Sequence, residues 1–198
     1  MMQDMHDGVG SSLRTALWAV EKGCLGEDAI ADVLRNCIDD LKLAIDSMEP
    51  VQTDLLLLLA TWRFRLEPRL ENTGITLHWD VSDVPVLDWL DPKSALHILR
   101  ILQEALTNVI KHAKATEIRV GTPVEGTSWV VVTLTDNGCG FSVAAAHERG
   151  GKGLANLKHR AQALGADIVW SSSPSGTCVS LRLPVSVLEV ESKGEVIE

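Results

Sequence analysis

Two short glycine-containing runs in the second half of the chain have the residue types and spacing best suited to chemistry. Residues 136–141 read Asp-Asn-Gly-Cys-Gly-Phe, and residues 151–156 read Gly-Lys-Gly-Leu-Ala-Asn. Glycine lets the backbone approach a ligand closely, and a helix that begins at the second run would offer free N–H groups to a phosphate. Isolated glycine pairs mark turns more often than phosphate sites, so the neighbouring elements decide the interpretation.

The segment before these runs has the pattern of an amphipathic helix. Its apolar stripe has i, i+3, i+4 spacing and consists of Ile98, Leu102, Ala105, Leu106, Val109 and Ala113. The opposite side carries a carboxylate, an amide, an ammonium and an imidazole, from Glu104, Asn108, Lys111 and His112. A solvated face is the common explanation of such a pattern. With the glycine runs downstream, we expect this side to form a wall that faces a metal ion and phosphates.

Taken together, the segments resemble the GHKL (Bergerat-fold) ATPases, and among them the sensor histidine kinases of the nitrate-sensor and thermosensor type. Residues 104–113 are similar to the family's asparagine box, residues 136–141 to its first glycine box and residues 151–156 to its second. The pair Gly176-Thr177 is similar to the closing Gly-Thr, where the hydroxyl supports the adenine-binding aspartate. The resemblance covers nearly the whole chain and implies an α+β protein with a GHKL α/β sandwich that binds ATP and Mg²⁺.

The resemblance also implies a role for each site residue. Asn108 would supply an oxygen ligand to Mg²⁺, Glu104 would hold the water molecules of the ion, and Lys111 and His112 would face the phosphates. The remaining cofactor-binding residues would be Asp136 for the adenine amino group, Gly138 and Gly140 for the close loop, Gly151, Lys152, Gly153 and Leu154 for the phosphate end, and Thr177. Two alternatives stay open, a turn aspartate for Asp136 and a solvated loop charge for Lys152.

A second candidate site lies near the start of the chain. His6 and Asp7 begin an apolar helical pattern in a segment that resembles the family's phosphoacceptor box. The resemblance implies that neutral His6 attacks the γ-phosphate through one ring nitrogen while Asp7 accepts or orients the proton on the other. Since His6 lies close to the side of Leu13 and Leu17, a packing histidine is the alternative. Ser11 stands where many relatives carry a glutamine, which predicts weak phosphatase action.

Hydrophobic spacing predicts an N-terminal αα-hairpin, with helices over residues 6–22 and 30–48. Two amphipathic helices cannot cover both of their stripes alone, so we expect a homodimer in which two hairpins form a four-helix bundle. Residues 1–50 would then be the dimerisation and phosphoacceptor domain. Residues 51–188 would form the ATP-binding domain, and residues 189–198 a disordered tail.

Within the second domain we expect helices over residues 55–70 and 153–164 in addition to the polar-faced helix. Strands are expected over residues 75–81, 116–121, 129–135, 166–171 and 177–183. We expect residues 142–150, between the glycine boxes, to be a mobile lid.

Composition limits the other functional classes. The chain has 198 residues, of which 45% are hydrophobic, and a net charge of −9, which argues against nucleic-acid binding. The four cysteines show no paired spacing, so neither a zinc site nor a disulfide framework is indicated. No apolar run approaches the roughly 20 residues of a membrane span. We therefore expect no membrane contact by this chain and a cytoplasmic location, as the catalytic part of a longer receptor.

The sequence thus predicts an ATP-dependent protein-histidine kinase that phosphorylates itself on His6. The phosphoryl group would pass to an aspartate in the receiver domain of a response regulator. The alternative is a GHKL nucleotide-gated switch or an anti-sigma-type serine kinase, in which His6 would only pack.

Overall fold

A computed structural model describes residues 17, 20, 54–71, 73–142 and 152–186 of the chain. The helices are α3 (Leu55–Leu70), α4 (Pro92–Asn108), the π-helical turn η1 (Val109–Ala113) and α6 (Lys152–Gln162). The strands are β1 (Thr76–Asp80), β2 (Glu117–Gly121), β3 (Val124–Glu125), β4 (Trp129–Asp136), β5 (Asp167–Ser173) and β6 (Gly176–Pro184).

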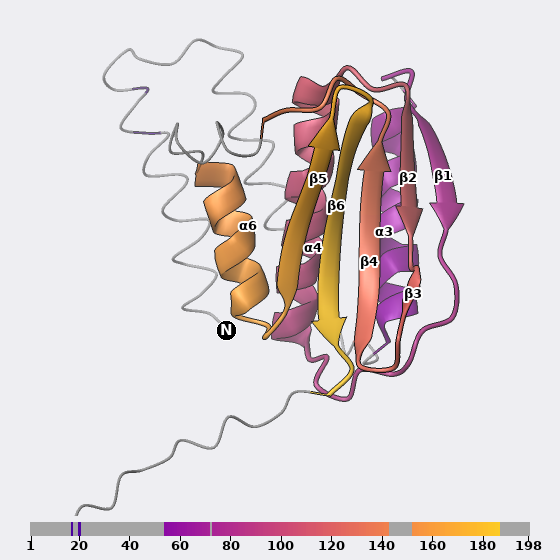
Figure 1. The fold of residues 1–198 in the computed structure, drawn as a ribbon, viewed down its shortest axis with the longest axis vertical. Coiled ribbons are helices and arrows are strands. Elements are labelled where there is room, and N and C mark those ends of the chain that lie inside the picture. Colours follow the sequence, from indigo (N-terminus) through magenta and orange to yellow (C-terminus); the bar gives the residue numbers. More distant parts are fainter. Residues whose placement is uncertain (1–16, 18–19, 21–53, 72, 143–151, 187–198) are drawn as a thin grey trace, which may run out of the picture.

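The strands form one sheet in the order β1-β2-β4-β6-β5, and the short β3 also pairs with β4. β1 runs parallel to β2, whereas all the other pairs are antiparallel. Helices α3, α4 and α6 all lie on the same face of the sheet (Figure 1). The described part of the chain is therefore a two-layer α+β sandwich, as the sequence predicts.

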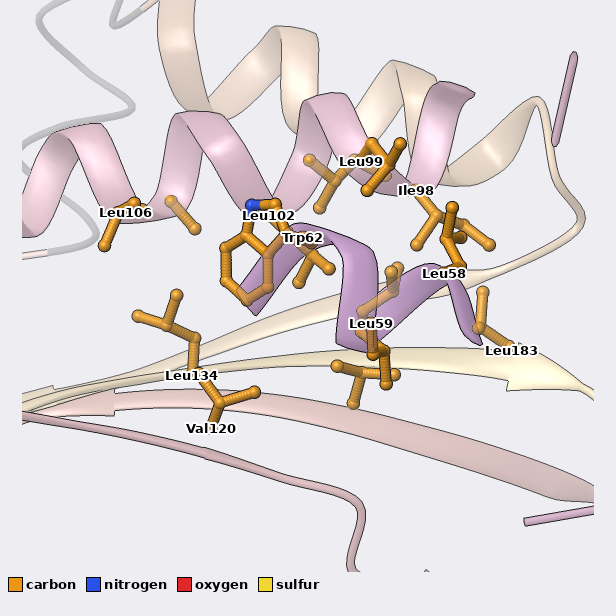
Figure 2. Close-up of a cluster of buried hydrophobic side chains, with 14 of the residues drawn as sticks. Leu58, Leu59, Trp62, Ile98, Leu99, Leu102, Leu106, Val120, Leu134 and Leu183 are labelled. Atoms are coloured by element: carbon orange, nitrogen blue, oxygen red, sulfur yellow. The ribbon is translucent and has the colours of Figure 1, made fainter. Parts of the chain in front are cut away.

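The core lies between the helices and the sheet. Figure 2 shows Leu59 and Trp62 of α3 between α4 and the sheet residues Val120, Leu134 and Leu183. Leu59 and Leu183 have no exposed surface. Burial of one such side chain stabilises the fold by about 2 kcal/mol. Since α4 contributes Ile98, Leu102 and Leu106 to the same cluster, its opposite face is held in a fixed orientation.

Two aspartates fix the starts of the helices that form the core. Asp54 Oδ1 accepts a hydrogen bond from Leu56 N at 2.7 Å, and Asp91 Oδ1 accepts one from Ser94 N at 2.6 Å. Burial raises the pKa of Asp91, but hydrogen bonds from Ser94 and the charge of Lys93 outweigh it and hold this pKa below its ordinary value.

Most of the predicted elements of the second domain are confirmed. Helix α3 has the predicted bounds, and the strands agree to within about two residues. The polar-faced helix begins earlier than its stripe suggests, at Pro92 after the Asp91 cap, and ends in the η1 turn. β3 was not predicted, because two residues carry no periodicity.

The predicted N-terminal hairpin lies outside the described residues except for Leu17 and Val20, which are helical and are 59% and 41% exposed. The predicted tail and nearly all of the predicted lid also lie outside the described residues. Within the described ranges, no helix is long and apolar enough to cross a membrane.

Candidate nucleotide-binding site

A cavity of about 380 Å³ lies between the end of α4, the first glycine run, α6 and the β5–β6 hairpin. Its lining is mostly apolar, with a few polar groups, as is common in binding sites for small molecules. The lining residues are Ala105, Asn108, Val109, His112, Ala113, Asp136, Gly140, Phe141, Gly153, Leu154, Leu157, Trp170, Thr177 and Val179.

The structure brings part of the polar side of α4 to this cavity. Asn108 and His112 line it, one helical turn apart. The Glu104 carboxylate lies next to α6, because a Cβ added to Gly153 would be 3.2 Å from Glu104 Oε1. A negative charge near the N-terminus of a helix is electrostatically favourable. Lys111 is exposed and is not among the lining residues.

Asp136 is the buried carboxylate of the cavity, with 5% of its surface exposed. Its Oδ1 accepts a hydrogen bond from Gly138 N at 2.8 Å, which is the turn expected of an aspartate before Asn-Gly. Its Oδ2 has no hydrogen-bond partner among the described residues. Because Asp136 also lines the cavity, the turn and the site are compatible, and Oδ2 is available to an N–H donor on a ligand.

The first glycine run is held against the end of α4 by backbone contacts. Cys139 N donates to Ala113 O at 2.8 Å, in the widened turn of η1. Gly138 packs so tightly on the same residue that a Cβ there would be 2.7 Å from Ala113 Cβ and would overlap Ala113 O. Widened π-helical turns are frequent at functional sites. Here the turn presents the carbonyl group that anchors the loop.

Asn137 anchors the same loop to strand β2. Its Oδ1 accepts hydrogen bonds from Thr116 N at 2.9 Å and Glu117 N at 3.0 Å, and its Nδ2 donates to Thr116 Oγ1 at 2.9 Å. One side chain therefore satisfies three groups at the start of β2 and fixes the residue that follows Asp136.

The β5–β6 hairpin holds the loop from the other side. Gly140 has a positive φ of 61°, and a Cβ there would lie 2.8 Å from the Ser173 carbonyl carbon and overlap its oxygen. Phe141 N donates to Ser172 Oγ at 2.9 Å. The Thr177 hydroxyl, expected to support Asp136, is hydrogen-bonded to Ser172 Oγ at 2.8 Å. Thr177 is 7% exposed and lines the cavity.

The second glycine run is described only from Lys152 onward. Lys152 is the first residue of α6, and Gly153 and Leu154 line the cavity from that helix. Gly151, His6 and Asp7 lie outside the described residues. Their predicted roles therefore stay predictions.

The residues near the end of α4 are compatible with magnesium. The described part of the chain contains no group of three or more His, Cys, Asp or Glu residues that could hold a metal ion. Asn108 and Glu104 offer an amide oxygen and a carboxylate instead, one turn apart on α4. Mg²⁺ prefers such hard oxygen donors and commonly takes its remaining ligands from water and substrate phosphates. This donor set fits an ion that enters with a nucleotide.

Sequence reasoning missed several lining residues, most clearly Trp170, Leu157 and Val179. Trp170 and Val179 are cross-strand partners, and Leu157 lies one turn after Gly153 on α6. Strand alternation on β5 and β6 could have placed Trp170 and Val179 on the face that carries Thr177. Ser172 was also missed, because the three consecutive serines at 171–173 are locally equivalent.

Known proteins share this domain. Residues 93–187 match the family described as histidine kinase-, DNA gyrase B-, and HSP90-like ATPase. The histidine kinase domain of the blue-light activated histidine kinase of Erythrobacter litoralis superposes with a TM-score of 0.63 at 19% identity, covering 89% of this chain and 83% of that one. This likeness establishes a shared fold.

Curated relatives extend the match toward the N-terminus. Sensor histidine kinase YxjM of Bacillus subtilis is 27% identical over 205 residues, covering 98% of this chain and 48% of the relative. The nitrate/nitrite sensor protein NarX of Escherichia coli is 28% identical over 178 residues, covering 83% of this chain and 29% of the relative. The chain thus spans half or less of the length of these relatives. Residues 93–187 form a histidine kinase-, DNA gyrase B- and HSP90-like ATPase domain, and the chain is similar to sensor histidine kinases over most of its length.

Proposed function

We propose that the chain is an ATP-dependent protein-histidine kinase of two-component signalling. The observation that carries the proposal is the buried Asp136 carboxylate, which has one oxygen available in an otherwise largely apolar cavity. A planar apolar base with an exocyclic amino group matches this arrangement, since its rings contact the apolar walls and its N–H donates to Oδ2.

The phosphates would extend from the base toward α6. Gly153 lies at the start of this helix, where free N–H groups favour anions, and Gly151 and Lys152 would complete that end. Asn108 and Glu104 would hold Mg²⁺, which neutralises phosphate charge in the transfer, while Lys111 and His112 face the phosphates. Gly138 and Gly140 keep the first loop close to its neighbours.

The phosphoryl group would be transferred to His6, with Asp7 accepting or orienting the imidazole proton, and then to an aspartate of a response regulator. Residues 1–50 would form a dimeric four-helix bundle that presents His6 to residues 51–188. The exposed Leu17 and Val20 are consistent with a partner helix covering that side. We also propose a cytoplasmic location, with residues 189–198 as a tail outside the domain.

The test of the kinase assignment is incubation with γ-labelled ATP and Mg²⁺. We expect acid-labile, base-stable label in the wild type and none in His6→Gln, whereas His159→Gln, at an exposed position on α6, keeps its label. ATP binding by the wild type without such label would contradict the assignment and favour the nucleotide-gated switch or the serine kinase.

The test of the base site is a titration with ADP and Mg²⁺. Asp136→Asn replaces an acceptor oxygen with a donor, so we expect affinity to fall about tenfold or more, since a hydrogen bond to a charged group contributes about 1.5–3 kcal/mol. Asp83→Asn, an exposed loop change of the same chemistry, should bind as the wild type does. Unchanged affinity in Asp136→Asn would move the adenine site elsewhere.

A further inference from the structure

The β5–β6 hairpin contributes a serine hydroxyl close to the cavity, in addition to the residues that line it. Its inner face carries Ser172, which is half-buried and lies directly across from Thr177 in the register of the two strands. Ser171 and Ser173 are exposed on the opposite face. Because side chains alternate between the two faces of a strand, only Ser172 of these three consecutive serines faces the site.

The Ser172 hydroxyl joins two parts of the site that are far apart in the sequence. It accepts a hydrogen bond from Phe141 N at 2.9 Å, at the end of the first glycine run, and lies 2.8 Å from Thr177 Oγ1. The close packing of Gly140 on the Ser173 carbonyl brings the loop to this point. One oxygen atom thus contacts both the loop and the cavity-lining threonine.

Either hydroxyl can be the donor in the second hydrogen bond. A serine hydroxyl has one proton and two lone pairs, and the Phe141 amide can only donate. In either direction one hydroxyl proton of the pair remains for another acceptor, and the Thr177 hydroxyl belongs to a residue that lines the cavity.

We propose that Ser172 is a positioning residue of the nucleotide site, whose hydroxyl fixes the first glycine run on β5 and holds the Thr177 hydroxyl in place at the cavity. This inference rests on the proposed function, because the ligand is taken to be an adenine nucleotide. Ser172 acts through Thr177 and the Phe141 amide, and Thr177 lines the same cavity as Asp136.

The test is a double-mutant cycle on the affinity for ADP with Mg²⁺, measured by calorimetry. We expect Ser172→Ala to weaken binding about 5- to 20-fold, the loss typical of one or two hydrogen bonds. Ser171→Ala, the adjacent exposed serine, should stay within about twofold of the wild type, and Ser172→Thr should restore most of the affinity. The fold-losses in ADP affinity of Ser172→Ala and Thr177→Val should not multiply in the double variant, because both substitutions remove the same hydrogen bond between the two residues.

A second nucleotide separates positioning from general damage to the fold. IDP lacks the amino group of ADP. If Ser172→Ala disorders the groups that contact the base, Asp136 and Thr177, the variant should lose more affinity for ADP than for IDP. Equal losses for ADP and IDP, multiplying losses in the cycle, or a Ser172→Ala variant that binds like Ser171→Ala would each overturn the proposal. If Ser172→Ala does not fold, Ser172→Cys replaces it, because a thiol keeps the shape but bonds weakly.

Failure of the proposed function gives a different result. A wild type that binds neither nucleotide contradicts the nucleotide site itself and, with it, the role of Ser172. A wild type that binds ADP and IDP equally contradicts base reading by Asp136, and the cycle with ADP alone then decides whether Ser172 positions the loop.

Discussion

Gly140→Ala is the substitution that tests most directly how the first glycine run is held. Gly140 has φ +61°, and an added Cβ would be 2.8 Å from the Ser173 carbonyl carbon and 2.9 Å from Ser172 Oγ, and would overlap Ser173 O. Two separate penalties therefore apply. The first is the left-handed backbone of a non-glycine residue, and the second is steric overlap with a strand that cannot shift without disturbing its pairing.

Gly165 separates the two penalties, because it has φ +63° and nothing within 4 Å of an added Cβ. Gly165→Ala should therefore cost about 1 kcal/mol from the backbone alone. Gly140→Ala adds an overpacking penalty of about 1–3 kcal/mol if the loop stays on β5. If the loop instead moves off the strand, part of that penalty is relieved and the hydrogen bond from Phe141 N to Ser172 is lost.

The assay combines urea unfolding of both variants with titration of ADP and Mg²⁺. We expect Gly140→Ala to lose clearly more unfolding free energy than Gly165→Ala, or to lose nucleotide affinity at least about tenfold, while Gly165→Ala keeps the affinity of the wild type. Equal unfolding free energies together with equal affinities would show that Gly140 does not pack on Ser173, and the account of the loop would fail.

Three further predictions concern assembly, capping and the core. Leu41→Glu places a charge in the predicted bundle and should give monomers by light scattering, while ADP binding survives; a variant that stays dimeric argues against the bundle. Asp91→Ala removes the cap of α4 and should cost about 1 kcal/mol at pH 7. Since the pKa of Asp91 is lowered in the fold, this difference should disappear in urea titrations as the pH falls below 3.8, and a constant difference would refute it. Leu59→Ala empties a fully buried position and should cost about 2–5 kcal/mol in the same assay; a loss under 1 kcal/mol would contradict the packing in Figure 2.

The sequence predicts the parts of this domain that rest on periodicity and end signals. Helix α3 starts after the Asp54 cap and keeps its apolar spacing to Leu70, so its bounds follow from local residues. The same holds for β4, whose run of β-branched residues ends at Asp136 before Asn-Gly. The glycine runs were identified for the same reason, since glycine is a strong local signal.

The contacts that shape the site do not follow from local sequence. Ser172 was not predicted because its role depends on the β5–β6 register, which sets it opposite Thr177 and leaves Ser171 and Ser173 outside. Asn137 looks like a turn residue, yet its partners are Thr116 and Glu117, about 20 positions earlier. Long-range pairing decides both cases, and no pattern within a short window contains that information.

The anchors of the first glycine run explain why different substitutions in it should have different consequences. Asn137 ties the run to β2, Cys139 N ties it to η1, and Phe141 N ties it to Ser172 on β5. Loss of one hydrogen bond leaves the other two anchors in place, so Ser172→Ala should weaken binding moderately with the loop still near its position. A Cβ at residue 140 instead pushes the backbone off β5, which strains the neighbouring anchors together. Because these contacts share one short loop, their effects should be coupled, and affinity should respond more strongly than stability to any change that moves the whole loop.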